Sequence, residues 1–276
     1  MKVLYFDKPM RLQDQLTLKI YSLGQVAYRG HLKTIIDRIG IGEKYKNWVS
    51  SNLDQYKLSI LGTKAVFHVD HNSELFHLTT MAETEKVVIK NVLNSIKSGD
   101  VFYDVGGHIG IYSCLVAKKG AQVIAFEPYP GNVERIEKNA RENQVPVDVY
   151  EYALSDSNGK ASLYVDSESE VSGGKGSIHG DGNKTISVET RTIDSLSKQS
   201  NIPSPNVIKI DVEGAELNVL QGMEDTLENP DCRRLYIEVH RWIVEKKKVI
   251  QKLESHGFTC TILDVENRDY VLATKD

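Results

Sequence analysis

A glycine-rich turn that begins at residue 104 is the segment of this sequence best suited to bind a nucleotide-like ligand. It reads Asp-Val-Gly-Gly-His-Ile-Gly and stands between an apolar run and a helical pattern. Glycines at such a turn let the chain reverse tightly and bring bare backbone against a ligand. The start of the next helix offers unpaired N–H groups to an anionic group. The candidate cofactor-binding residues in this turn are Asp104, Gly106, Gly107, His108 and Gly110.

A carboxylate at the end of the next apolar run points to an adenosine ligand. Glu127 lies 23 positions after Asp104, where an acid can accept hydrogen bonds from both ribose hydroxyls. The dinucleotide fingerprint Gly-x-Gly-x-x-Gly fails, because His108 and Ile111 stand where its second and third glycines are needed. An acid at the head of the loop also favours a cationic amino group over a phosphate. S-adenosylmethionine therefore fits the pattern better than NAD(P).

Three polar residues at the ends of later apolar runs are candidates for catalysis. Methyl transfer to a hydroxyl needs a well-placed acceptor and a general base. Asp211 and Glu213 follow the run 207–210, and His240 follows the run 235–239. The carboxyl ends of neighbouring parallel strands meet at one edge of a sheet. We expect His240 to be the base, because an imidazole titrates near neutral pH; the alternative is a hydrogen-bonded histidine that closes a strand.

The same runs carry two further charged residues. Lys209 interrupts an apolar run, where an unpaired ammonium group would be costly, so we expect it to pair with Glu238 on the neighbouring strand. Asp211, Glu213 and Glu238 could alternatively supply oxygen ligands to Mg²⁺. Nothing in their spacing requires an ion, and we predict no metal site.

Several segments resemble the FkbM family of S-adenosylmethionine-dependent methyltransferases, which belong to the class I Rossmann-like methyltransferases. The matching segments, in order, are Val-Phe-Tyr-Asp-Val-Gly-Gly-His-Ile-Gly at 101–110, Ala-Phe-Glu-Pro at 125–128, Ala-Leu-Ser-Asp at 153–156, Ile-Lys-Ile-Asp-Val-Glu-Gly-Ala-Glu at 208–216 and Ile-Glu-Val-His at 237–240. One departure is Gly107-His108, where the family usually has Ala-Asn. The resemblance implies methyl transfer to an oxygen, commonly a hydroxyl of a sugar, a macrolide or another secondary metabolite. It adds Ala153 and Asp211 to the residues expected at the cofactor.

Apolar runs alternate with helical patterns from residue 101 onward, which predicts a parallel sheet covered on both faces. The expected strands are 101–105, 123–126, 147–153, 207–210 and 235–239, and the expected helices are 109–119, 131–143, 215–227 and 242–256. The runs 258–263 and 270–273 are joined by a turn at 267–269, too short for a parallel crossover, so they should be antiparallel. Together with the resemblance, this predicts an α/β fold: a seven-stranded class I methyltransferase sheet, mostly parallel, with an antiparallel last strand.

The chain is expected to divide at residue 80. Residues 1–80 are predicted to be a helical N-terminal extension with a hairpin at 57–69, turning at Gly62-Thr63, and residues 81–276 to be the methyltransferase domain. Thr80 and Glu83 form a capping-box pattern that should open a helix. Solvent-facing positions are expected for His68, His71 and His77. A glycine-rich insertion at 166–185 is expected to be the tip of a hairpin over the acceptor; the alternative is disorder without function.

Composition excludes several other classes of protein. The 276 residues carry 34 Lys+Arg against 38 Asp+Glu, a net charge of −4, so nucleic acid is not expected as a partner. No run approaches the ~20 apolar residues of a membrane span, and charge interrupts the first seven residues too soon for a secretory segment. Three scattered cysteines indicate a reducing, cytoplasmic setting. The expected partner is a small-molecule or glycan acceptor, and the oligomeric state is left open. The remaining alternatives are an NAD(P)-linked oxidoreductase and a catalytically silent cofactor-binding scaffold.

Overall fold

The computed structural model describes residues 53–165, 176–177, 184–199, 202–265 and 268–275, together with positions 19 and 48. The predicted helical part of the N-terminal extension lies outside these ranges. Most of the glycine-rich insertion does too, including the predicted hairpin tip.

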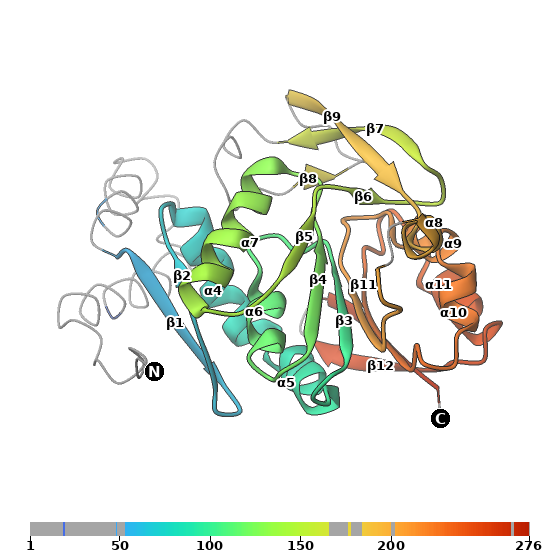
Figure 1. Ribbon diagram of the computed structural model, residues 1–276, viewed down its shortest axis with the longest axis horizontal. Coiled ribbons are helices and arrows are strands. Elements are labelled where there is room, and N and C mark those ends of the chain that lie inside the picture. The colour runs from blue at the N-terminus through green and yellow to red at the C-terminus, as the bar shows by residue number, and fades with distance from the viewer. Residues whose placement is uncertain are drawn as a thin grey trace, which may run out of the picture.

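A seven-stranded sheet lies at the centre of the described part of the chain (Figure 1). Its strands in spatial order are β12 (Thr259–Val265), β13 (Arg268–Thr274), β11 (Arg234–Val239), β10 (Val207–Ile210), β3 (Val101–Val105), β4 (Gln122–Phe126) and β5 (Asp148–Tyr150). Strands β11, β10, β3, β4 and β5 pair in parallel, whereas β13 is antiparallel to both of its neighbours. The predicted class I methyltransferase sheet, with its antiparallel last strand, is confirmed.

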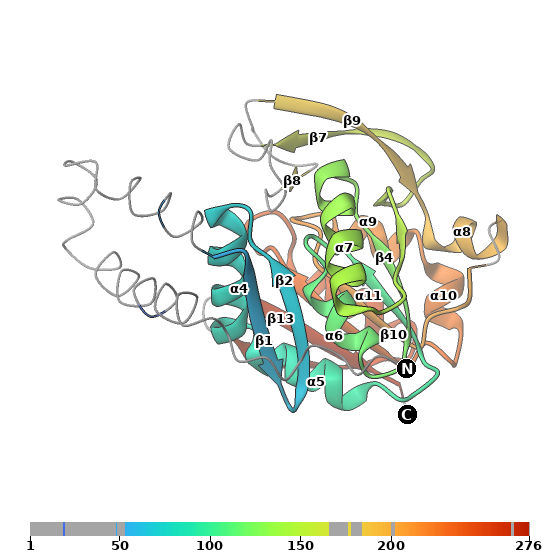
Figure 2. The same ribbon diagram turned by 60° about the vertical axis from the view of Figure 1, so that its left-hand side comes forward.

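Helices cover both faces of this sheet, as predicted (Figure 2). One layer is α4 (Asn72–Thr84), α5 (Lys86–Ser95), α6 (Ile111–Ala117) and α7 (Pro130–Asn143), and the other is α8 (Ile193–Gln199), α9 (Glu216–Gln221), α10 (Glu224–Glu228) and α11 (Lys246–Glu254). Successive residues of a strand face opposite layers: Phe102 belongs to the buried cluster that contains Ile89 of α5, and Tyr103 to the cluster that contains Leu220 of α9. None of the described helices is both long and apolar enough to cross a bilayer.

A hairpin precedes the first helix of the described chain, as predicted, but its turn lies one residue earlier than expected. Strands β1 (Gln55–Ile60) and β2 (Thr63–His68) pair directly through Ile60 and Thr63, which leaves Leu61 and Gly62 as the turn. Both have positive φ, 51° and 79°, the backbone of the turn type that suits a two-residue hairpin.

The helix after this hairpin begins earlier than predicted. A capping box formed by His71 and Glu74 opens α4, and the helix runs through residue 80. The prediction of a helix start at Thr80 is therefore wrong, because an earlier cap already satisfies the first turn.

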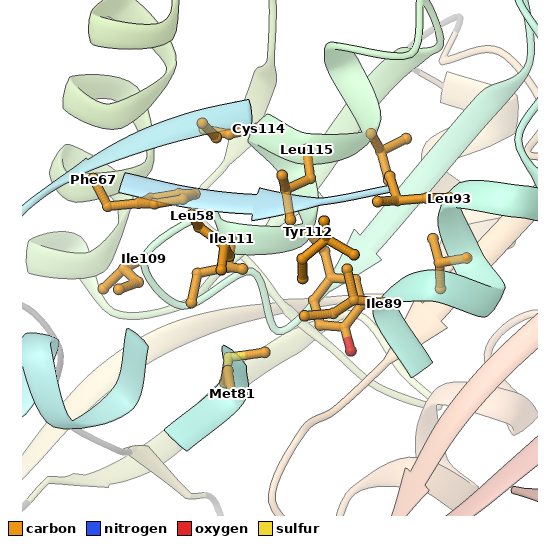
Figure 3. Close-up of a cluster of buried hydrophobic side chains, with 14 of the residues drawn as sticks. Leu58, Phe67, Met81, Ile89, Leu93, Ile109, Ile111, Tyr112, Cys114 and Leu115 are labelled. Carbon is orange, nitrogen blue, oxygen red and sulfur yellow. The ribbon is translucent and has the colours of Figure 1, made fainter. Parts of the chain in front are cut away.

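The hairpin and α4 share a core with the sheet. Leu58, Phe67 and Met81 pack in the same cluster as Ile109 and Leu115 around α6 (Figure 3). The division at residue 80 stays a prediction, and α4 spans it.

Polar contacts reinforce the attachment to α7. Asn143 accepts a hydrogen bond from the Val66 N–H (2.8 Å), and Asn139 accepts one from the His68 N–H (2.9 Å). Arg135 forms a buried ion pair with Glu74 of α4, 2.8 Å from Nε to Oε1. These contacts fix the hairpin and α4 against the sheet-covering helix.

The single strand predicted at 147–153 is divided between the main sheet and a small second sheet. Strand β5 ends at Tyr150, where the Tyr152 N–H donates to the Tyr150 carbonyl (2.9 Å) and turns the chain. The chain then enters β6 (Ala153–Leu154), which pairs with β9 (Lys184–Arg191). Strand β9 pairs with β7 (Gly159–Val165), and β7 with β8 (Gly176–Ser177). Strands β7 and β9 are antiparallel neighbours and form the two arms of the hairpin expected around the insertion.

Several element boundaries differ from those predicted. The predicted helix 215–227 is divided into α9 and α10 near Gly222, where a Cβ would lie 2.0 Å from the Ser155 carbonyl oxygen. The helix predicted from residue 242 begins at Lys246, after a turn. Arg268 and Asp269 belong to β13 rather than to the turn before it.

The Arg135–Glu74 pair should make a measurable contribution to stability. Arg135→Met is expected to lower the free energy of unfolding by about 3 kcal/mol, because it leaves a fully buried carboxylate without its cation. Urea denaturation followed by circular dichroism measures this. Arg141→Met, on the same helix, removes only an exposed pair with Glu137 and should cost less than about 1 kcal/mol. Equal losses in the two variants would contradict the prediction.

Candidate active site

One cavity brings together most of the predicted site residues. It lies at the carboxyl ends of β3, β4 and β10. Strands β4 and β10 flank β3 on opposite sides, and the point where the strand order reverses in this way is a usual place for a ligand. Counted out to its open mouth, with open solvent included, it encloses about 990 Å³. Its walls include the predicted residues Gly106, Gly107, His108, Glu127, Ala153, Asp211 and Glu213.

The glycine turn crosses directly over the loop that follows β10. Gly106 has a φ of +77°, and a Cβ at this position would lie 1.8 Å from the Asp211 carbonyl oxygen. The N–H groups of Gly106 and Gly107 both donate to the Phe126 carbonyl, at 2.9 and 3.2 Å. Only glycine permits this crossing, which brings the ends of β3, β4 and β10 into one floor for the cavity.

Glu127 is held rigidly in the cavity wall. Its Oε2 accepts the His108 N–H at 2.8 Å, and its Oε1 accepts the Tyr129 N–H at 3.0 Å. The side chain is buried, and this burial raises the pKa of Glu127 to about 7, even though both hydrogen bonds favour the ionised form. The Asn132 side chain also donates to this carboxylate. Because a carboxylate can accept about four hydrogen bonds, Glu127 has room for a ligand hydroxyl.

Asp104 lies beneath the turn and is not part of the cavity wall. Its Oδ2 accepts hydrogen bonds from the Ser113 N–H (3.0 Å) and hydroxyl (2.6 Å), which fixes the first turn of α6. Gly110, which precedes α6 with a φ of +82°, is also outside the wall. These two residues shape the turn rather than contact the contents of the cavity.

Lys209 pairs with different carboxylates from the one predicted. Its Nζ lies 3.3 Å from Asp211 Oδ2 and 3.7 Å from Asp104 Oδ1, and it donates to the Gly106 carbonyl at 3.0 Å. Burial alone would lower the pKa of Lys209, but the two carboxylates outweigh it and raise the pKa. The predicted Lys209–Glu238 pair is wrong.

Strand register explains this difference. On β3 the residue opposite Lys209 is Asp104, whereas on β11 it is Tyr236. Glu238 binds β13 instead: it lies 2.8 Å from the Arg268 guanidinium and accepts the Tyr270 hydroxyl at 2.7 Å.

His240 is enclosed by two carboxylates. Its Nδ1 lies 2.7 Å from Glu216 Oε1, and its Nε2 lies 3.2 Å from Glu213 Oε2. Burial would lower the pKa of His240, but hydrogen bonds to Glu213 and Glu216 outweigh it and raise the pKa to about 10. The imidazole is therefore protonated at neutral pH, and the expectation that it titrates near neutrality is wrong.

The three acidic residues of the magnesium alternative do not share one site. Glu238 is engaged by Arg268 and Tyr270, and its place beside Asp211 and Glu213 is taken by His240. Ligand-type atoms of Asp211, Glu213 and His240 lie within 4.8 Å of one another. A cation at this point would have to displace the proton that His240 shares with Glu213.

Helix α4 supplies a wall of the cavity that the sequence motifs do not indicate. His77 and Met81 line it, and the His77 ring meets the His108 ring edge-on with centroids 4.1 Å apart. The solvent-facing position expected for His77 is wrong. The one available signal was the spacing of four between His77 and Met81, which places both on one helix face. Arg268, from β13, also lines the cavity and was not predicted.

Comparison with known families agrees with this geometry. Residues 104–270 match the methyltransferase FkbM domain. The chain belongs to the FkbM methyltransferase family. Membership confirms the resemblance seen in the sequence, and it favours methyl transfer over the oxidoreductase alternative.

Three named methyltransferases are similar to stretches of this chain that differ in length. Hexuronic acid methyltransferase AglP of Haloferax volcanii is 29% identical over 240 residues, covering 86% of this chain and 95% of its own. 31-O-demethyl-FK506 methyltransferase FkbM of Streptomyces tacrolimicus is 27% identical over 59% of this chain and 74% of its own. 2-O-methyltransferase NoeI of Sinorhizobium fredii is 31% identical over 48% of this chain and 60% of its own. A solved precorrin-6y C5,15-methyltransferase from Geobacter metallireducens aligns with a TM-score of 0.45, 12% identity and coverage of 69% and 88%.

The raised pKa of His240 predicts a pH-dependent contribution to stability. With a folded-state pKa of about 10 against about 6.5 unfolded, the contribution is complete below pH 6.5 and is lost as pH rises toward 10. Wild type should exceed His240→Asn in free energy of unfolding by on the order of 2 kcal/mol more at pH 6.5 than at pH 10. Glu213→Gln, which removes one of the two carboxylates, should show a smaller loss over this range. Parallel stability curves for wild type and His240→Asn would refute the prediction.

Proposed function

We propose that this FkbM methyltransferase transfers a methyl group from S-adenosylmethionine, bound in the cavity, to a hydroxyl oxygen of a sugar. The observation that carries the proposal is Glu127, fixed by the His108 and Tyr129 N–H groups within a glycine-floored cavity. A fixed carboxylate beside bare backbone is the arrangement that binds the ribose of an adenosine ligand. When bound, S-adenosylmethionine supplies a methyl group already activated by its sulfonium.

The charges around the cavity favour a cationic ligand. Each of two basic side chains near the cavity pairs with two carboxyl groups. Lys209 pairs with Asp104 and Asp211, and Arg268 pairs with Glu85 and Glu238. Burial, with the neighbouring Asp211 carboxylate, raises the pKa of Glu238 to about 7. An added positive charge would stabilise the ionised form of these groups. The chain therefore provides a setting for a sulfonium that it does not provide for a pyrophosphate.

Within this proposal, Glu213 accepts the proton of the acceptor hydroxyl. Its side chain lines both the cavity and an adjoining pocket, so it stands where cofactor and acceptor would meet. His240 is already protonated at neutral pH and therefore serves as a positioning residue that holds Glu213 through Nε2. Asp211, beside the same junction, is held by Lys209 and helps to orient the acceptor.

The name of one relative supports a sugar as the acceptor, and the name of a second supports transfer to oxygen. AglP, which matches over 95% of its own length, is named for action on a hexuronic acid, and NoeI is named a 2-O-methyltransferase. The test is incubation with S-adenosylmethionine and a panel of sugars, followed by mass spectrometry for the gain of one methyl in place of one hydrogen. Cofactor binding without methylation of any sugar would favour the scaffold alternative.

Ionisation of Glu127 should control cofactor affinity. Because an ionised carboxylate is the stronger acceptor for hydroxyl groups, the Kd for S-adenosylmethionine should rise as pH falls below about 7. Glu127→Gln should weaken binding at pH 8 by about tenfold and flatten the dependence between about pH 6 and 8. Isothermal titration calorimetry measures both, and Glu137→Gln on the outer face of α7 is the matched control. A wild-type pH dependence in Glu127→Gln would contradict the role given to this residue.

Loss of the Glu213 carboxylate should affect turnover rather than cofactor binding. Glu213→Gln is expected to lower kcat by about 100-fold or more, with little change in the Kd for S-adenosylmethionine. His240→Asn should lower kcat less and shift the acidic limb of the kcat–pH profile upward, because a cation beside Glu213 is removed. The control is Glu245→Gln, which changes an exposed acid just before α11. Wild-type kcat in Glu213→Gln would exclude it as the proton acceptor.

A further inference from the structure

A second pocket adjoins the cofactor cavity at the carboxyl end of β11. Counted out to solvent, it encloses about 620 Å³. Glu213 and Arg268 line both this pocket and the larger cavity, so the two meet at these side chains. A ligand in the second pocket would therefore lie beside the group proposed to accept the proton.

Trp242 lines this pocket with an unusually exposed indole, 72% accessible to solvent. The exposure does not result from a loose segment. The N–H groups of Ile243 and Val244 both donate to the His240 carbonyl, at 2.8 and 2.9 Å, and Val244 is buried in the core. The turn thus fixes the backbone that carries this exposed aromatic ring, and aromatic side chains are enriched among binding hot spots.

The same turn is fitted against the loop that carries Glu213. Gly214 has a φ of +105°, and a Cβ there would lie 2.6 Å from Ile243 Cδ1, so Ile243 occupies space that only glycine leaves open. His240, at the start of the turn, contacts Glu213 directly. These contacts fix the turn that carries Trp242 relative to the loop that carries Glu213.

Charged groups of both signs surround the indole. The Arg241 guanidinium lies 5.4 Å from the centroid of the Trp242 ring and 3.9 Å from Asp269. Arg241 remains more than half exposed, whereas Asp269 also binds Lys246 at 2.8 Å. Sugar hydroxyls both donate and accept hydrogen bonds, and the C–H face of a pyranose is apolar. An aromatic platform flanked by carboxylates and a guanidinium matches this combination.

We infer that the second pocket binds a pyranose ring of the acceptor, with its apolar face on Trp242 and one hydroxyl directed toward Glu213. This inference rests on the proposed function, because it assigns the acceptor to a sugar. A flat phenolic acceptor is the competing occupant, and it would be expected to use an enclosed apolar slot instead of this polar, open pocket.

The chain offers a direct optical test, because it has only two tryptophans. Trp48→Phe leaves Trp242 as the single indole. Titration of this variant with methyl glucoside or methyl glucuronoside, in the presence of S-adenosylhomocysteine, should change its fluorescence in a saturable way. Catechol, the flat phenolic probe, should give no saturable change. A response to catechol alone, or to none of the three, would overturn the inference.

Kinetics give an independent test with a sugar that is turned over. Trp242→Ala should raise KM for that sugar by about tenfold or more, while Trp242→Phe, which keeps a ring, should stay near wild type. Ile262→Ala, another exposed apolar residue on β12, is the matched control and should leave KM unchanged. An unchanged KM in Trp242→Ala would overturn the inference.

The failure of this inference and that of the proposed function are distinguishable. Calorimetry with S-adenosylmethionine reports on the cavity alone, and Trp242→Ala should bind it like wild type. Absence of binding to wild type would reject the proposed function. Binding and sugar methylation that are both insensitive to Trp242→Ala would reject only the second pocket as the acceptor site.

Discussion

The buried ammonium group of Lys209 ties together the two loops on which the rest of the site depends. It contacts Asp104 at the end of β3, Asp211 at the end of β10 and the backbone carbonyl of Gly106. A lone charge at this depth would be strongly destabilising, so its three oxygen partners must remain where they are. Because Gly106 also touches the Asp211 backbone, the same contacts set the floor of the cavity and the orientation of Asp211.

Two carboxylates with different proposed roles lie on opposite sides of this floor. Glu127 stands on the β4 side, bound to the glycine turn, where it suits a ribose. Glu213 stands on the β10 side, bound to His240, where it borders the second pocket. The strand order explains why Glu127 and Glu213 lie apart, because β4 and β10 are on opposite sides of β3.

The parts of this arrangement that local chemistry determines were predictable from sequence. The glycine turn, the acid at Glu127 and the antiparallel closing pair follow from glycine spacing, apolar periodicity and a tight turn. The order of the seven strands was implied by the resemblance to the class I methyltransferases. The partner of Lys209 was not predictable in this way, because strand register places Asp104 opposite it and strand alternation alone does not specify register. The choice of His240 as a base left out Glu216, which lies 24 residues earlier in α9 and contacts the imidazole in the folded chain. Long-range pairing therefore accounts for both errors.

The contribution of α4 to the cavity has a consequence for how small a working enzyme of this type can be. His77 and Met81 belong to a helix that precedes the segment matched by the FkbM family, residues 104–270. A chain trimmed to the family segment would retain the glycine turn and every acidic group at the junction with the second pocket, yet it would lack one side of its reaction chamber. The unit that encloses the cavity is thus larger than the segment matched by the family model, and it includes α4 and the hairpin that anchors this helix.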